Sequence, residues 1–166
     1  MYDQLTENDI QKIKEEIEYR KLVVRKQAIE AVKEARAHGD LSENFEYYAA
    51  KKDKNKNESR IRYLERMIKT AKVISDNAQK DEVGINKTVV LYMEEEDETE
   101  EYKLVTTIRG NSMQGKISIE SPLGKAILGK RLGERVFVQV SADYGYYVII
   151  QDIENTNDEE DSIRSF

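Results

Sequence analysis

The stretch ARAHGDLSENFEYYAA, residues 35–50, contains a single glycine, Gly39, between two long runs that lack both glycine and proline. The upstream run covers residues 4–38, and the downstream run covers residues 40–83. A glycine directly after a helical pattern is typical of a helix C-terminus, because glycine adopts the left-handed conformation without strain. The sequence therefore predicts two long helices that meet in a short turn near Gly39.

Apolar residues recur in both runs at the helical spacing of three or four residues. The first run is expected to bury Ile10, Ile13, Ile17, Val24, Ala28, Ala31 and Ala35. The second run has the seam of a coiled coil, formed by Tyr47, Ala50, Lys54, Asn57, Ile61, Leu64, Ile68 and Ala71. Two such helices pack antiparallel, and about 32 helical residues give an arm of about 48 Å. We expect this hairpin to occupy residues 1–76.

A polar stretch at residues 77–82 is interpreted as a linker, and after it the apolar pattern changes to the alternation of β-strands. Strands are expected within 88–93, 102–105, 116–119, 135–140 and 147–150, with the acidic run 94–101 as a hairpin loop. One short helix has Ser121 as its N-cap, Pro122 at its first position and Gly129 after its end. The prediction is a two-domain α+β protein, with a small α+β domain over 83–154 and a disordered acidic tail over 155–166.

The composition excludes several kinds of site. The 166 residues include no cysteine and one histidine, His38, so disulfides, cysteine-based zinc sites and histidine clusters are ruled out. No apolar run approaches the roughly 18 residues of a membrane span, and the N-terminus does not resemble a signal peptide. We therefore expect a cytoplasmic protein. The net charge of −6 argues against a free-standing nucleic-acid binder.

Two carboxylates in the predicted turn, Asp40 and Glu43, allow two interpretations. In the structural one, Asp40 is the N-cap of the second helix and Glu43 completes a capping box at the positive end of the helix dipole. In the functional one, they offer hard oxygen ligands for magnesium at the far end of a long arm. Two carboxylates alone make a weak magnesium site, so a partner would supply the other ligands. The two interpretations are compatible.

Behind the turn, residues 51–72 contain nine basic residues against three acidic ones. A solvated face of the coiled coil would explain this run, and contact with RNA phosphate would explain it equally well. The candidates for RNA contact are Lys51, Lys52 and Lys54, which are nearest to the turn. His38 is interpreted as a residue that favours the negative end of the first helix's dipole.

Two blocks of sequence resemble the signatures of the Gre transcript-cleavage factors. Residues 39–50, GDLSENFEYYAA, are similar to the family's tip signature GDLxENxEYxAA. Residues 115–130, GKISIESPLGKAILGK, are similar to the family's second block, GK(I/V)SxxSP(I/L)GxA followed by LIGK. The blocks occur in the right order about 70 residues apart. The resemblance extends from about residue 10 to residue 153, and the acidic composition favours the GreA-like branch.

The resemblance implies a function for the turn. Gre factors bind multisubunit bacterial RNA polymerase through a C-terminal domain with an FKBP-like fold, and their hairpin enters the secondary channel. There the tip carboxylates, matched here by Asp40 and Glu43, help to hold the second catalytic magnesium and orient the water that cleaves backtracked RNA. Asn44 and Tyr47 match neighbouring signature positions and are expected to support the tip.

The same resemblance implies an accessory factor for the polymerase rather than an enzyme. It would bind no cofactor when alone, share magnesium with the polymerase, contact the RNA 3′ end, act as a monomer and need no membrane. The chain departs from the family pattern at residues 25–26, where an Arg-Pro is replaced and the first helix is expected to be unbroken. Residues 106–111 are less acidic than usual, and the tail beyond Asn155 is extra.

Two alternatives remain open. A Gre-like regulator would occupy the same channel and tune or inhibit transcription without inducing cleavage, although the presence of both Asp40 and Glu43 counts against this. A peptidyl-prolyl isomerase or chaperone would need an apolar pocket with several convergent aromatic side chains. The second domain offers mainly tyrosines and one phenylalanine, Phe137.

Overall fold

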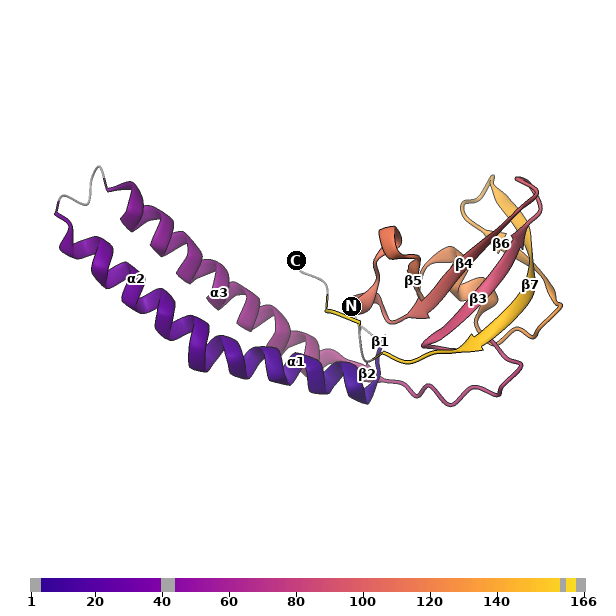
Figure 1. Cartoon of the computed structure of the whole chain (residues 1–166), viewed down its shortest axis with the longest axis horizontal. Helices are drawn as coiled ribbons and strands as arrows, with labels where there is room; N and C mark the ends of the chain where they lie inside the picture. Colours follow the sequence, from indigo (N-terminus) through magenta and orange to yellow (C-terminus); the bar gives the residue numbers. More distant parts are fainter. Residues whose placement is uncertain (1–3, 40–43, 159–160, 164–166) are drawn as a thin grey trace. The chain divides into compact units, whose positions relative to one another are not determined.

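The computed structural model describes residues 4–39, 44–158 and 161–163. They form two compact units, a helical unit over residues 10–71 and a sheet unit that joins residues 4–9 to the chain from Lys72 onward. The first residues were expected within the hairpin, but they belong with the sheet unit because β1 (Gln4–Leu5) pairs in parallel with β2 (Lys72–Val73). The α+β class predicted from the sequence is confirmed (Figure 1).

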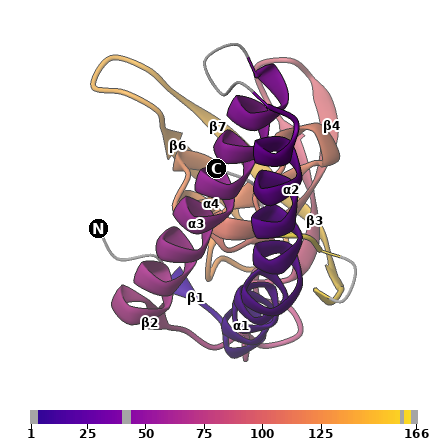
Figure 2. The same ribbon diagram turned by 90° about the vertical axis from the view of Figure 1, so that its left-hand side faces the viewer.

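The helical unit is an antiparallel hairpin. Its first arm consists of α1 (Glu7–Tyr19), whose first turn lies in the sheet unit, a π-helical turn (Arg20–Val24) and α2 (Arg25–Ala37). Its second arm is α3 (Phe45–Thr70), which lies beside α2 in Figures 1 and 2. The first helix is unbroken from Glu7 to Ala37, as expected, and its middle includes a π-turn in which one extra residue widens the helix.

Burial along the hairpin follows most of the predicted seam. On α3, Ile61 and Leu64 are buried, and every other predicted seam position is at least half-buried. On the first arm, Ala31 is exposed and Val32 is buried instead, which corrects the predicted position. The helix presents Val32 four residues after Ala28, and valine has more apolar surface to remove from water than alanine.

The middle of the hairpin holds a polar cluster in place of apolar contacts. Asn57 Oδ1 accepts a hydrogen bond from Arg20 Nη1 at 3.0 Å, and its amide donates to the Arg20 carbonyl at 3.3 Å. The Glu16 carboxylate accepts from Arg20 Nε and Arg60 Nε, each at 2.8 Å. Burial disfavours the charged form of Glu16, but the hydrogen bonds from Arg60 and Arg20 outweigh it and lower the pKa of Glu16. The cluster therefore joins the two arms by charge-assisted contacts.

The sheet unit contains a five-stranded sheet in the order β5-β4-β3-β7-β6. The central strand β3 (Lys87–Met93) pairs antiparallel with β4 (Glu98–Val105) and β7 (Gly145–Asn155). At the edges, β6 (Arg135–Gln139) is antiparallel to β7, and β5 (Lys116–Ser118) is parallel to β4. Alternate residues of β3 are buried, and the core that they join comprises Val83, Ile85, Val89, Leu91, Met93, Leu104, Ile119, Ile127, Val136, Val138, Val148 and Ile150.

The short helix α4 (Pro122–Ile127) is capped as the sequence predicted. Ser121 Oγ accepts a hydrogen bond from the Gly124 backbone amide at 3.0 Å, and Pro122 occupies the first turn. Two single-turn 3-10 helices, Thr107–Arg109 and Ser112–Gln114, connect β4 to β5. Within the described chain, no helix combines the length and the apolar character needed to cross a membrane.

Two expectations for the acidic segments are wrong. The loop predicted over 94–101 is shorter, because β4 begins at Glu98 and the turn after β3 includes Asp97 with a left-handed φ of 53°. The tail was expected to be disordered over 155–166, but in its described part Asn155 ends β7, and Asp158 and Asp161 are buried in the sheet unit. Cations of that unit, described below, provide the reason for the burial of Asp161.

Candidate functional site at the hairpin tip

The described part of the tip comprises the end of α2 and the start of α3. The two predicted acidic residues, Asp40 and Glu43, lie outside the described residues. The first arm ends as predicted, since α2 stops at Ala37 and Gly39 has a positive φ of 112°. His38 closes the helix through its backbone amide, which donates to the Ala35 carbonyl at 3.3 Å.

Asn44 connects the two arms at the base of the tip. Its Oδ1 accepts a hydrogen bond from the Tyr47 amide at 3.0 Å, and its Nδ2 donates to the Ala35 carbonyl at 2.6 Å. Asn44 is therefore the N-cap of α3, which corrects the expectation that Asp40 caps a helix starting at the turn. Asparagine is among the best N-cap residues, and here it also donates a second hydrogen bond to a carbonyl in the last turn of α2.

Two side-chain pairs reinforce this connection. The guanidinium of Arg36 lies 5.6 Å from the centre of the Tyr47 ring. A hydrogen bond from Arg36 lowers the pKa of the Tyr47 phenol, and the charges of Lys51 and Lys54 act in the same direction. The second pair is His38 Nδ1 with Glu46 Oε2 at 3.0 Å. Neither pair was predicted from the sequence, because each joins residues on opposite sides of the turn.

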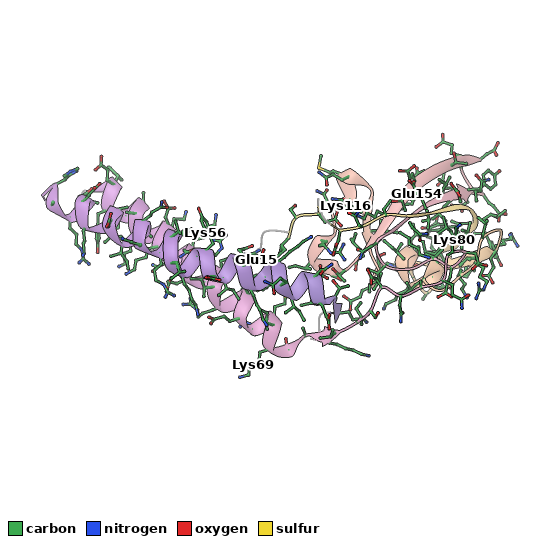
Figure 3. The ribbon with its side chains drawn as sticks, turned by 60° about the horizontal axis from the view of Figure 1, so that its bottom comes forward. Glu15, Lys56, Lys69, Lys80, Lys116 and Glu154 are labelled. Atoms are coloured by element: carbon green, nitrogen blue, oxygen red, sulfur yellow. The ribbon has the colours of Figure 1, made fainter. Side chains whose placement is uncertain are left out.

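The basic and aromatic side chains behind the tip differ in exposure. Lys51 and Lys52 are exposed, whereas Lys54 is half-buried at the seam. Further along α3, Lys56 is exposed as well (Figure 3). Phe45, the first residue of α3, is 85% exposed and was not among the predicted site residues. Its position three residues before the exposed Tyr48, off the apolar seam, is the signal that predicts an aromatic contact surface there.

The described residues contain no group of three or more His, Cys, Asp or Glu side chains that could hold a metal ion. That finding does not extend to residues 40–43. Two carboxylates there would offer oxygen ligands of the kind that magnesium prefers, and a partner would complete the coordination.

A cavity of about 240 Å³ in the sheet unit bears on the isomerase alternative. Its walls include Ile74, Val83 and Ile119, and none of the described residues that line it is aromatic. An isomerase pocket was expected to bring several aromatic side chains together, so this cavity does not favour that alternative.

Comparison with known proteins identifies the family. A family model described as "Transcription elongation factor, N-terminal" matches residues 3–73, and one described as "Transcription elongation factor, GreA/GreB, C-term" matches residues 78–155. The chain is 48% identical over 139 residues to transcription elongation factor GreA of Caldanaerobacter subterraneus subsp. tengcongensis, covering 83% of this chain and 88% of the relative. GreA of Bacillus subtilis is 42% identical over 135 residues, covering 81% and 86%.

GreA of Chloroherpeton thalassium matches over a longer span, with 43% identity over 147 residues that cover 88% of this chain and 93% of the relative. The chain belongs to the GreA/GreB family of transcription elongation factors. The resemblance and the elongation function predicted from the two sequence blocks are confirmed. The roles of the individual tip residues remain predictions.

Proposed function

We propose that this protein binds bacterial RNA polymerase through its sheet unit, inserts its hairpin into the secondary channel and stimulates cleavage of backtracked RNA. The proposal is supported by family membership that extends over both units of the chain. The polymerase carries out the cleavage, and this chain acts as an accessory factor that allows arrested complexes to resume synthesis.

In this proposal, Asp40 and Glu43 contribute carboxylate oxygens to a magnesium ion that the polymerase already holds. Carboxylates are suitable ligands for this hard cation, and a site with two metals stabilises both the attacking and the leaving oxygen of a phosphodiester. One carboxylate also orients the attacking water. The chain needs no metal of its own, because the remaining ligands come from the polymerase and the RNA.

The observation that carries the proposal is the construction of the tip base. Asn44 hydrogen-bonds to both arms, and the Arg36–Tyr47 and His38–Glu46 pairs join the same two helices on either side of residues 40–43. Catalytic groups gain from being held in place before the substrate arrives, because less freedom is then lost in the transition state. The exposed Lys51 and Lys52, with Lys54 at the seam, contact phosphates of the extruded RNA in this proposal.

Replacement of one tip carboxylate tests the proposal. Asp40→Asn removes a charge while keeping the size of the side chain, and Asp53→Asn makes the same change at an exposed position of α3 as a matched control. Both variants should keep their helicity and their affinity for polymerase. RNA shortening in stalled complexes should fall by about a hundredfold or more for Asp40→Asn only, in line with the loss of a group that acts in the transition state.

Normal RNA shortening by Asp40→Asn would contradict the role assigned to this carboxylate. If the unmodified protein binds polymerase but shortens no RNA, the protein is the non-cleaving regulator of the secondary channel instead.

A further inference from the structure

The segment after β7 returns to the sheet unit although it lies beyond the matched family region. The family match ends at residue 155, and Asp158 and Asp161 are only 5% and 6% exposed. Aspartate is seldom buried unless cations or hydrogen-bond donors surround it. The place where the tail docks is therefore a site with its own chemistry, and it does not depend on the function proposed for the hairpin tip.

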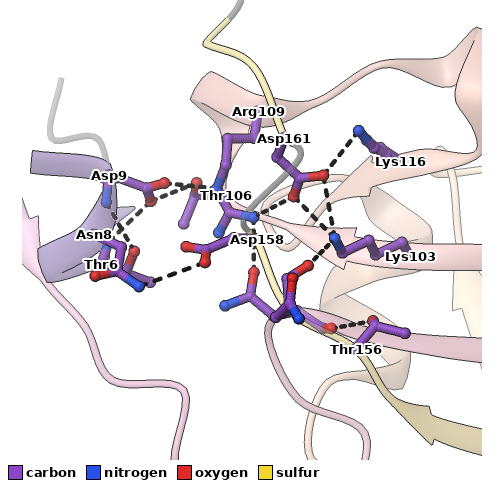
Figure 4. A network of polar contacts seen from close by, with 12 residues as sticks. Thr6, Asn8, Asp9, Lys103, Thr106, Arg109, Lys116, Thr156, Asp158 and Asp161 are labelled. Carbon is purple, nitrogen blue, oxygen red and sulfur yellow. Dashed lines mark hydrogen bonds and ion pairs between the residues drawn. The ribbon is translucent and has the colours of Figure 1, made fainter. Parts of the chain in front are cut away.

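Three cations converge on the carboxylate of Asp161 (Figure 4). Lys116 Nζ lies 2.8 Å from Oδ1, Arg109 Nη1 donates to Oδ2 at 2.8 Å, and Lys103 Nζ lies 3.1 Å from both oxygens. The side chain of Arg109 is fully buried, and those of Lys103 and Lys116 are only 16% and 17% exposed. Burial opposes ionisation of Asp161, but the hydrogen bonds from Lys116, Lys103 and Arg109 prevail and lower its pKa to about 2.

The tail does not create this arrangement of cations. Arg109 is held from its other side by Asp9, which accepts from Nε at 2.6 Å, and by Asn86, which accepts from Nη1 at 2.7 Å. Lys103 and Lys116 are direct partners in the parallel register of β4 and β5, so the sheet itself places them side by side. Like charges on adjacent strands repel one another, and an anion between them removes that repulsion.

The docked tail leaves one donor of the site without a hydrogen-bond partner among the described residues. That donor, Arg109 Nη2, is buried. Asp9 offsets one of the three positive charges, so two remain for the tail, which brings the carboxylates of Asp161 and the buried Asp158. A phosphate group carries a charge of about −1.5 to −2 at neutral pH and offers additional acceptor oxygens. Its charge is close to that of the two tail carboxylates that it would replace, and it offers an additional acceptor for Arg109 Nη2.

We propose that Arg109, Lys103 and Lys116 form a phosphate-binding site in the sheet unit, and that the tail occupies it through Asp161 as an internal competitor. A phosphate group displaces the Asp161 carboxylate, and release of the tail follows. Because the tail is tethered close to the site, its effective concentration is in the millimolar range, and a ligand has to compete with it.

Titration with inorganic phosphate, followed by calorimetry at constant ionic strength, tests the proposal in the full chain. Asp161→Ala removes the competitor, while Asp143→Ala removes an exposed carboxylate elsewhere in the sheet unit as a matched control. Phosphate should bind Asp161→Ala at least about tenfold more tightly than the unmodified protein or Asp143→Ala. Adding Lys116→Gln to Asp161→Ala should abolish the gain, because Lys116 is one of the three cations.

Equal phosphate affinity of Asp161→Ala and the unmodified protein would overturn the proposal, and so would a gain that persists after Lys116→Gln. If Asp161→Ala does not fold, Asp161→Asn takes its place, since it removes the charge and keeps a hydrogen-bond acceptor; the same two outcomes then apply. Phenyl phosphate as a second probe distinguishes the source of the ligand. Binding of both probes indicates a phosphate carried on a larger molecule, and binding of inorganic phosphate alone indicates the free ion.

Discussion

Each unit of the molecule buries an arginine, and the two are neutralised in different ways. In the sheet unit, Arg109 is fully buried and is met by two carboxylates, Asp9 and Asp161, whose side chains are 0% and 2% exposed. In the hairpin, the side chain of Arg60 is 4% exposed and is met by Glu16, which is 23% exposed and also binds Arg20. Both arginines are stabilised by carboxylates, but only the hairpin pair keeps contact with water.

This difference indicates how each unit tolerates its charge. A charge closed off from water is costly unless it is paired and hydrogen-bonded, so the sheet unit depends on every partner of Arg109. In the narrow hairpin, no point is far from solvent, and water can replace part of a lost contact. Removal of a carboxylate should therefore cost more stability in the sheet unit than in the hairpin.

The largest loss of stability is expected for Asp9→Asn in the sheet unit. The amide can still accept the capping hydrogen bond that Asp9 receives from the Thr6 backbone, but it no longer neutralises Arg109. Loss of one partner of a buried ion pair costs about 3–5 kcal/mol. Amide hydrogen exchange of β3 and β4 measures the unfolding free energy of the sheet unit. A loss below about 1 kcal/mol, within the range of exposed ion pairs, would show that Arg109 is not shielded from water.

A second effect is expected in the pH dependence of the unfolding free energy. The pKa of Asp161 is lowered to about 2 in the folded protein, against about 3.9 for a free aspartate. The stabilisation that ionised Asp161 gives to the folded protein is therefore present above about pH 4 and is lost as the pH falls toward 2. This loss lowers the unfolding free energy by about 2 kcal/mol. Asp161→Asn should lack this part of the pH dependence. Unfolding free energies of both proteins at pH 5 and pH 2 test the expectation, and equal losses on acidification would refute it.

A smaller effect is expected for Glu16→Gln in the hairpin. The change leaves Arg60 and Arg20 without the charge that they share, at a cost of about 1–2 kcal/mol. Hydrogen exchange of the α3 amides reports on this unit separately. If the cost equals or exceeds that of Asp9→Asn, exposure to water does not explain the difference between the two arginines.

The smallest effect is expected at the surface of the sheet. Glu94 accepts a hydrogen bond from Arg135 Nε at 2.7 Å, and the pKa of Glu94 is lowered mainly by this contact. Arg135 is exposed and Glu94 is only half-buried, so Glu94→Gln should leave the melting temperature unchanged within error. A clear decrease would mean that even exposed pairs contribute to this sheet.

Sequence patterns predicted the elements that depend on neighbouring residues. The seam around Ile61 and Leu64 follows from helical periodicity, and the cap of α4 follows from Ser121 and Pro122. Features that depend on distant residues were not accessible in this way. Asp9 and Asp161 lie 100 and 52 residues from Arg109, so no local pattern links them.

The candidate site shows the same difference between features that depend on neighbouring residues and features that depend on distant ones. Its acidic residues, Asp40 and Glu43, were found through a local signature, and their roles remain predictions. The contacts at the base of the tip join residues across the turn, as between Asn44 and the Ala35 carbonyl. These contacts depend on the relative position of the two helices, which the periodicity of the sequence alone does not determine.

Dependence of RNA cleavage on magnesium concentration tests the proposed role of the tip most directly. If Asp40 contributes oxygen ligands to a magnesium ion held by the polymerase, Asp40→Asn should raise the magnesium concentration needed for half-maximal cleavage, while Asp53→Asn should not. Polymerase binding should be equal for both. An unchanged magnesium requirement, with cleavage still stimulated, would contradict the account.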